Sequence, residues 1–141
     1  MMIIDDFGIR RWYKGYHLHR EDGPAVEYVN GDKFWCKEGR FHREDGPALK
    51  YANGSKHWYK KGKLHREDGP AIEYVDGEKH WYKEGRLHRE DGPAIEYADG
   101  RKEYWKNDRK WTAKELDGIG LSYSKCKRCN RDFIDKINNY F

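Results

Sequence analysis

The stretch LHREDGPAIEYVDGEKHWYKEGR, residues 64–86, decides the fold because close copies of it stand directly before and after it. The copies are FHREDGPALKYANGSKHWYKKGK at 41–63, LHREDGPAVEYVNGDKFWCKEGR at 18–40, and LHREDGPAIEYADGRKEYWKND from residue 87. One histidine therefore recurs every 23 residues, at His19, His42, His65 and His88. Self-similarity at such a period indicates one small structural unit that stacks on its neighbours.

The composition favours a thin sheet over a deep core. Of the 141 residues, 36% are apolar and 38% are charged, which is a poor ratio for an ordinary globular interior. Six Trp, eleven Tyr and five Phe nevertheless argue against a disordered chain, because disordered chains are depleted in aromatic residues. We therefore expect an aromatic-rich β-sheet.

The charge is balanced over the repeats and basic only towards the end of the chain. Residues 1–108 hold 21 basic and 21 acidic side chains, whereas residues 109–141 hold eight basic and four acidic ones. No apolar run approaches the ~20 residues of a membrane span, and MMIIDDFGIRR has acids where a secretory signal would be basic and apolar. Three cysteines at irregular spacings agree with a reducing compartment. These features predict a cytoplasmic protein with no membrane partner.

The turn signals within one copy leave room for two short strands. Asp76-Gly77 is a strong hairpin signal, and it lies between the apolar stretch 71–75 and the aromatic stretch 79–83. Glu84-Gly85 marks a further turn after the second strand. Each repeat is therefore predicted to be a β-hairpin.

Period-two alternation assigns the side chains of these strands to two faces. Ile72 and Tyr74 share one face, and Ala71 and Glu73 point the other way. In the second strand one column consists of Trp12, Trp35, Trp58, Trp81 and Tyr104, and lysines including Lys37, Lys60 and Lys83 flank it on the same face. We expect these lysine stems to lie over the indole rings as cation–π contacts.

The two ends of the chain depart from the repeat. Residues 10–14, RRWYK, are expected to be a lone second strand that starts the series. After the last repeat, a short helix is predicted at Thr112–Leu116 and a stronger one from about Asn130, which is a good N-cap. The prediction is a mainly β protein with an elongated antiparallel hairpin-repeat sheet over residues 1–109 and a small C-terminal helical cap over residues 110–141.

The repeat also resembles a known family. A period of 23, a hairpin punctuated by glycine and Tyr/Trp in both strands are similar to MORN repeats, and LHREDGPAxEYxxGxKxWYKxG resembles a divergent MORN-like form found in bacteriophages, large DNA viruses and some bacteria. The resemblance covers about residues 10–109 and implies an elongated hairpin sheet without catalytic residues or cofactors. This chain has Trp-Tyr-Lys and His-Arg-Glu-Asp where MORN repeats have Gly-Glu-Trp and His-Gly, so lipid or partner binding by that family does not transfer.

Two motifs suggest site chemistry and are interpreted structurally. The four HRED tetrads (19–22, 42–45, 65–68 and 88–91) place His beside acids, but equivalent positions two strands apart are roughly 9–10 Å from each other, too far to share one zinc ion. We expect Arg–carboxylate pairing there instead. Cys126-Lys-Arg-Cys129 is half of a zinc motif and needs remote partners or a second chain, so two free thiols are the favoured interpretation.

The sequence thus predicts a non-catalytic module that binds another macromolecule through an exposed aromatic and lysine face. The predicted contact residues are Trp12, Trp35, Trp58, Trp81, Tyr104, Lys37, Lys60 and Lys83, with no metal ligand among them. The family resemblance implies a phage-encoded inhibitor of a host protein, for example a defence component. The alternatives are a single-stranded nucleic-acid-binding protein and a structural homo-oligomer.

Overall fold

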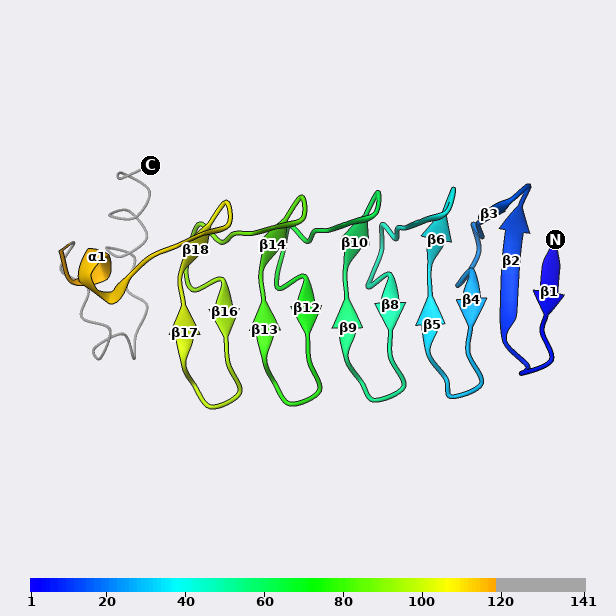
Figure 1. Cartoon of the computed structure of the whole chain (residues 1–141), viewed down its shortest axis with the longest axis horizontal. Coiled ribbons are helices and arrows are strands. Elements are labelled where there is room, and N and C mark those ends of the chain that lie inside the picture. The colour runs from blue at the N-terminus through cyan, green and yellow to red at the C-terminus, as the bar shows by residue number, and fades with distance from the viewer. Residues whose placement is uncertain (119–141) are drawn as a thin grey trace.

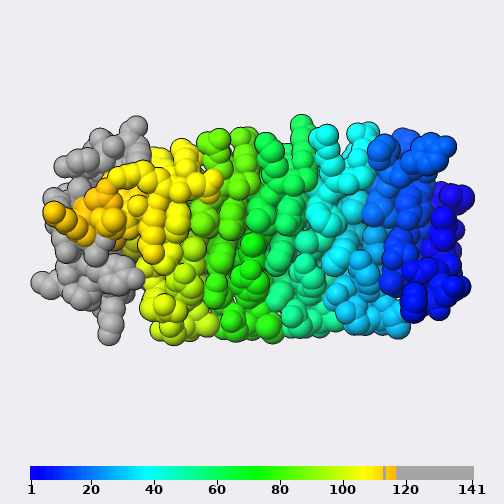
Figure 2. Space-filling view, in the orientation of Figure 1, coloured from blue at the N-terminus to red at the C-terminus, as the bar shows by residue number. Residues whose placement is uncertain are grey.

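In a computed structural model, residues 1–118 of the chain are described, and they form an elongated body (Figure 1). An eleven-stranded antiparallel sheet runs along it in the order β1-β2-β4-β5-β8-β9-β12-β13-β16-β17, with β3 paired to β2. Each repeat contributes two adjacent strands, so the repeats succeed one another along the long axis and form successive bands in the space-filling view (Figure 2). The predicted mainly β, hairpin-repeat architecture is confirmed.

The strands of the main sheet are short. They are β1 (Met2–Ile4), β2 (Arg10–Lys14), β4 (Val26–Glu27), β5 (Lys33–Phe34), β8 (Leu49–Lys50), β9 (Lys56–His57), β12 (Ile72–Glu73), β13 (Lys79–His80), β16 (Ile95–Glu96) and β17 (Lys102–Glu103). Within a repeat, Ile72 pairs with His80 and Glu73 with Lys79. The hairpin closes at Gly77, whose φ of 95° suits glycine and whose N–H donates to the carbonyl of Tyr74.

A second, tighter hairpin follows in every repeat. The pairs are β2 with β3 (His17–Leu18), β6 (Cys36–Lys37) with β7 (Arg40–Phe41), β10 (Tyr59–Lys60) with β11 (Lys63–Leu64), β14 (Tyr82–Lys83) with β15 (Arg86–Leu87), and β18 (Trp105–Lys106) with β19 (Arg109–Lys110). The two-residue loop Glu84-Gly85 has φ values of 49° and 81°, as a type I′ turn requires. Each repeat therefore contains two hairpins, where the sequence predicted one.

The prediction of one continuous second strand over 79–83 is wrong, because the strand changes partner at Trp81. The N–H of Trp81 donates to the carbonyl of Ala94 in the next repeat (2.8 Å). Its own carbonyl accepts from the N–H of His88 (3.0 Å), which belongs to the tight hairpin. Trp81 thus joins β13 in the main sheet to β14 in the tight hairpin.

The ends differ in part from the prediction. The strand at 10–14 is present as β2, but β1 pairs with its outer side, so it does not stand alone. A short helix, α1 (Ala113–Gly118), confirms the helix predicted near Thr112, whose hydroxyl accepts the N–H of Glu115 while the Glu115 carboxylate accepts the N–H of Thr112. The predicted helix from Asn130, and Cys126 and Cys129, lie outside the described residues.

The buried residues form columns across the repeats. One column contains Ala25, Ala48, Ala71 and Ala94, all fully buried, and the next contains Val26, Leu49, Ile72 and Ile95. A ladder of edge-to-face ring contacts runs through Tyr28, Phe34, Tyr51, His57, Tyr74 and His80, with centroids 5.1–5.8 Å apart. Lateral stacking of repeats therefore supplies the contacts that a deep core would supply elsewhere.

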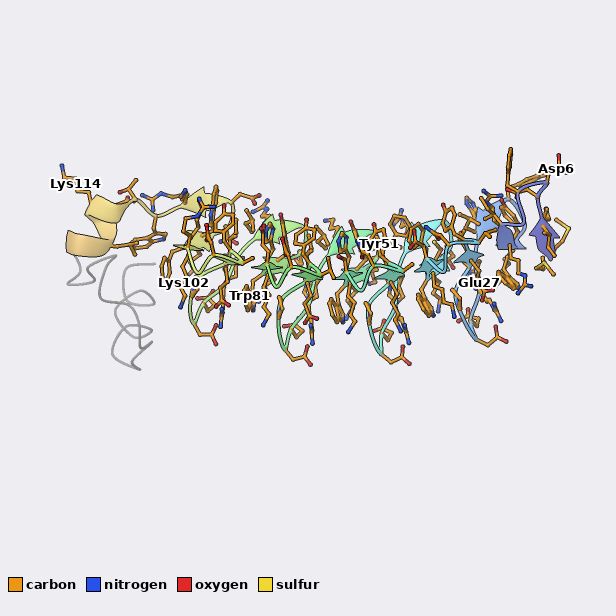
Figure 3. All side chains as sticks on the ribbon, turned by 90° about the horizontal axis from the view of Figure 1, so that it is seen from below. Asp6, Glu27, Tyr51, Trp81, Lys102 and Lys114 are labelled. Carbon is orange, nitrogen blue, oxygen red and sulfur yellow. The ribbon has the colours of Figure 1, made fainter. Side chains whose placement is uncertain are left out.

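The two faces of the main sheet carry different side chains. Tyr51 lies on one side of the sheet, and Glu27, Trp81 and Lys102 lie on the other (Figure 3). This agrees with the alternation predicted from the sequence. The side that bears the tryptophans is called the Trp face below.

Candidate functional site

Each HRED loop, defined as the six residues His-Arg-Glu-Asp-Gly-Pro, is anchored to the Trp face by its arginine. The guanidinium carbon of Arg66 lies 3.9 Å from the ring centroid of Trp58. Its Nε donates to Asp68 (2.9 Å) and its Nη1 donates to the carbonyl of Pro70 (3.1 Å) and to Glu73 (2.9 Å). The same stacking recurs for Arg20 on Trp12, Arg43 on Trp35 and Arg89 on Trp81, at 4.0–4.1 Å.

The glycine of the loop leaves space for this arginine. A Cβ added at Gly69 would lie 3.0 Å from the Arg66 guanidinium carbon, and the corresponding distance at Gly23 is 2.9 Å. Neither glycine has a positive φ, so the requirement is one of space and not of backbone conformation. The arginine is thus held between an indole ring on one side and a bare Cα on the other.

The histidine of the loop connects neighbouring repeats. The Nδ1 of His65 accepts the backbone N–H of Glu84 in the next repeat (3.0 Å), and Nε2 is 2.7 Å from a carboxylate oxygen of Glu67. Because Nδ1 is an acceptor, the proton of the neutral ring lies on Nε2 and is donated to Glu67. His19, His42 and His88 make the same two contacts with their own partners.

These bonds also stabilise the ionised form of the carboxylates. The hydrogen bond from Arg66 lowers the pKa of Asp68, and the hydrogen bond from His65 lowers the pKa of Glu67. Both groups are therefore ionised at neutral pH, and both side chains are largely exposed. The loops present carboxylates to solvent while the arginines lie beneath them, which confirms the Arg–carboxylate pairing predicted for these motifs.

Grooves form where successive HRED loops face each other. One groove of about 650 Å³ is lined by Trp58 and Lys60 together with the loops that contain Glu44 and Glu67. A second, of about 490 Å³, is lined by Trp35 and Lys37 and shares Glu44 with the first. Equivalent grooves thus follow one another at the spacing of the repeat.

The structure brings four of the eight predicted contact residues together and places the other four elsewhere. Trp35, Trp58, Lys37 and Lys60 line the grooves, and Tyr104 is buried and takes no part in the surface. Lys83 lines a separate cavity of about 430 Å³ beside the tight hairpin. Trp12 and Trp81 lie under the arginines of their own repeats.

The expectation that lysine stems cover the indoles is wrong. Arginines of the HRED loops occupy those positions, and Lys37 and Lys60 turn instead towards Glu21 (3.5 Å) and Glu44 (3.9 Å). The sequence contains a pattern that indicates the arginine–tryptophan pairing, because in four copies an arginine lies eight residues after the tryptophan of the column. Strand alternation alone does not reveal it because the arginine lies in a loop.

Among residues 1–118, no group of three or more His, Cys, Asp or Glu side chains is arranged to hold a metal ion. Over the same part of the chain, no helix is long and apolar enough to cross a membrane. No family model matches the sequence, and no curated protein matches it. The resemblance to MORN repeats therefore stays a prediction.

Proposed function

We propose that this protein is a non-catalytic module that binds another protein through the row of grooves on its Trp face. The observation that carries the proposal is the repetition of one groove, with the same Trp, Lys and HRED groups, at intervals of 23 residues. Extended periodic surfaces of this kind are the usual recognition surfaces of repeat proteins.

The groups that line the grooves are held in place before any partner arrives. Arg43 and Arg66 are stacked on indoles and bonded to Asp45 and Asp68, so little side-chain freedom remains to be lost on binding. Aromatic rings and arginines are also the residues that dominate binding energy at protein interfaces. A preorganised, aromatic and charged surface favours protein recognition.

The histidines argue for a structural role and against catalysis. Both ring nitrogens of His65 are engaged, one by a backbone N–H and one by a carboxylate. A general base needs a nitrogen within reach of substrate, and here the acceptor nitrogen is already occupied. The resemblance noted above adds a specific candidate partner, a host protein such as a defence component, and that step rests on the resemblance alone.

Affinity capture tests the proposal. The full chain is immobilised, host lysate is applied, and retained proteins are quantified for the wild type and for the Lys37→Ala/Lys60→Ala variant. Lys61→Glu is the matched control, because Glu38 and Glu84 occupy the equivalent position in other repeats and Lys61 lies outside the grooves. We expect a protein that the wild type and the control retain and the double variant loses.

Two results would overturn the proposal. One is retention of no protein above background by the wild type, with nucleic acid bound instead. The other is equal retention of the same protein by the wild type and by a double variant whose circular dichroism and thermal midpoint match those of the wild type.

A further inference from the structure

The Trp face carries a row of charges that alternate across neighbouring strands, with one interruption. Following the register of the main sheet, the row consists of Arg10, Glu27, Lys33, Lys50, Lys56, Glu73, Lys79, Glu96 and Lys102. Opposite charges are direct neighbours everywhere except at Lys50, which stands opposite Lys33 on one side and Lys56 on the other. Three cations therefore lie side by side.

The interruption comes from a single residue. The other repeats have Glu27, Glu73 and Glu96 at the position of Lys50. In those repeats the HRED arginine approaches this glutamate, with Arg20–Glu27 at 3.7 Å, Arg66–Glu73 at 2.9 Å and Arg89–Glu96 at 3.2 Å. Arg43 has Lys50 at the corresponding place, and its ion pair is with Asp45 of its own loop (2.9 Å).

The glutamates that flank the three lysines are bonded to arginines. Glu27 is shared by Arg10 (3.5 Å) and Arg20, and Glu73 is bonded to Arg66. Lys33 and Lys50 are exposed, and among residues 1–118 no ion pair involves either of them or Lys56. Like charges directly opposite each other destabilise a sheet. Local departures of this kind are expected at functional or strained sites.

We propose that Lys33, Lys50 and Lys56 form a binding site for a short acidic segment of a protein partner. This inference rests on the proposed function, because it assigns partner chemistry to part of the same Trp face. Three lysines on adjacent strands span roughly 10 Å, since neighbouring strands are about 4.8 Å apart. On an extended segment two alternate carboxylates span about 6.7 Å and three span about 13 Å, which brackets the span of the lysines.

The surroundings of the cluster favour an acidic peptide over nucleic acid. Glu27 and Glu73 flank the three lysines on the two sides, so a phosphate backbone that continued along the sheet would meet negative charge in either direction. Residues 1–108 also carry as many acidic as basic side chains, whereas nonspecific nucleic-acid binding depends on many cations acting together. A short anionic segment can pair with the three lysines without reaching Glu27 or Glu73.

The test titrates the isotope-labelled full chain with acetyl-Gly-Glu-Glu-Glu-Glu-Gly-amide at low salt, with the all-Gln peptide as a control ligand. We expect saturable amide shifts centred on Lys33, Lys50 and Lys56. Lys50→Gln should weaken binding by about fivefold, the upper range for one exposed charge pair. Lys79→Gln is the matched control, because Lys79 is in the same row between two glutamates, and it should bind like the wild type.

Lys50→Glu gives a second measurement that keeps a folding defect from being mistaken for a binding effect. It restores the alternation of the row, so it should abolish peptide binding while raising the urea midpoint of unfolding. The proposal is overturned by an absence of saturable binding to the wild type, by equal weakening in Lys50→Gln and Lys79→Gln, or by Lys50-dependent binding of oligothymidylate without binding of the peptide.

The outcomes separate this inference from the proposed function. A captured protein that Lys50→Glu retains as well as the wild type does would overturn the acidic-segment site and leave the recognition surface standing. Peptide binding that depends on Lys50, in a protein that captures no partner, would support the site and overturn the proposed function.

Discussion

The guanidinium of Arg66 lies 3.9 Å from the ring centroid of Trp58, eight residues earlier in the chain, and the same pair recurs in four repeats. A cation over an indole contributes about 0.5–1 kcal/mol where exposed and about 2 kcal/mol where desolvated. Arg66 also bonds to Asp68, Pro70 and Glu73. It therefore connects the HRED loop to the sheet through Trp58 and Glu73 and ties the loop to itself through Asp68 and Pro70.

Gly69→Ala should destabilise the protein by about 1–3 kcal/mol, the usual cost of overpacking. The new Cβ would lie 3.0 Å from the guanidinium carbon of Arg66 and would force it away from Trp58. The measurement is the free energy of unfolding in urea. The control is the same substitution in an Arg66→Ala background, where the clash is gone and the cost should nearly vanish. An equal loss of unfolding free energy in both backgrounds would contradict the placement of Arg66 between Trp58 and Gly69.

His65→Phe should cost about 1–3 kcal/mol, because it keeps an aromatic ring but leaves the N–H of Glu84 without its acceptor. The amide of Glu84 should then exchange with solvent faster, which hydrogen-exchange NMR measures directly. Glu67→Gln is the control: it alters only the partner of Nε2, at an exposed position, and should change stability by less than about 0.5 kcal/mol. Unchanged exchange at Glu84 in His65→Phe would show that the histidine does not link the repeats.

The sequence predicts those parts of the fold that depend on local patterns. The hairpin at Asp76-Gly77 and the opposite orientation of Ile72 and Glu73 follow from turn chemistry and alternation, and both are present. The break at Trp81 does not follow from either, because its partner is the carbonyl of Ala94, 13 residues away in the next repeat. Local propensity cannot show where a strand changes partner.

Sequence patterns are equally limited in what they predict about the candidate site. Lys50 is visible in the aligned repeats as a lysine in place of Glu27, Glu73 and Glu96. Its meaning depends on Lys33 and Lys56, which become its neighbours only through the pairing of β5, β8 and β9. The burial of Tyr104 is likewise invisible to a pattern that aligns it with four tryptophans.

Cys36 should be nearly inert in the folded protein. Burial raises the pKa of its thiol from 9.0 to about 11, so the thiolate fraction at a given pH should be about a hundredfold smaller than in the unfolded chain. Alkylation by iodoacetamide, followed residue by residue with mass spectrometry, compares native protein with protein in urea. Rapid labelling of Cys36 under native conditions would show that its strand opens readily. Cys126 and Cys129 are quantified separately in the same digest.

His57 should make the protein less stable in mild acid. Burial, and to a smaller extent the charge of His80, lower the pKa of His57 below 6.5, so the unfolded chain binds more protons than the folded protein between that value and the folded pKa. Stability then rises with pH across this window, and it is lost as the pH falls from about 6.5 towards the folded pKa. Carboxylates such as Glu67 and Asp68 have lowered pKa values, so their contribution to folding stability is lost only in stronger acid, below about pH 4.5.

His57→Phe should therefore flatten the dependence of stability on pH between 7 and 5, with little change at pH 7. The repeat itself supplies the template, because Phe34 occupies the equivalent position and makes the equivalent edge-to-face contact with Tyr28, at 5.1 Å as for His57 with Tyr51. Urea unfolding at a series of pH values provides the measurement. If the curves of stability against pH for the wild type and the variant were parallel in this window, His57 would be protonated equally in the folded and unfolded states.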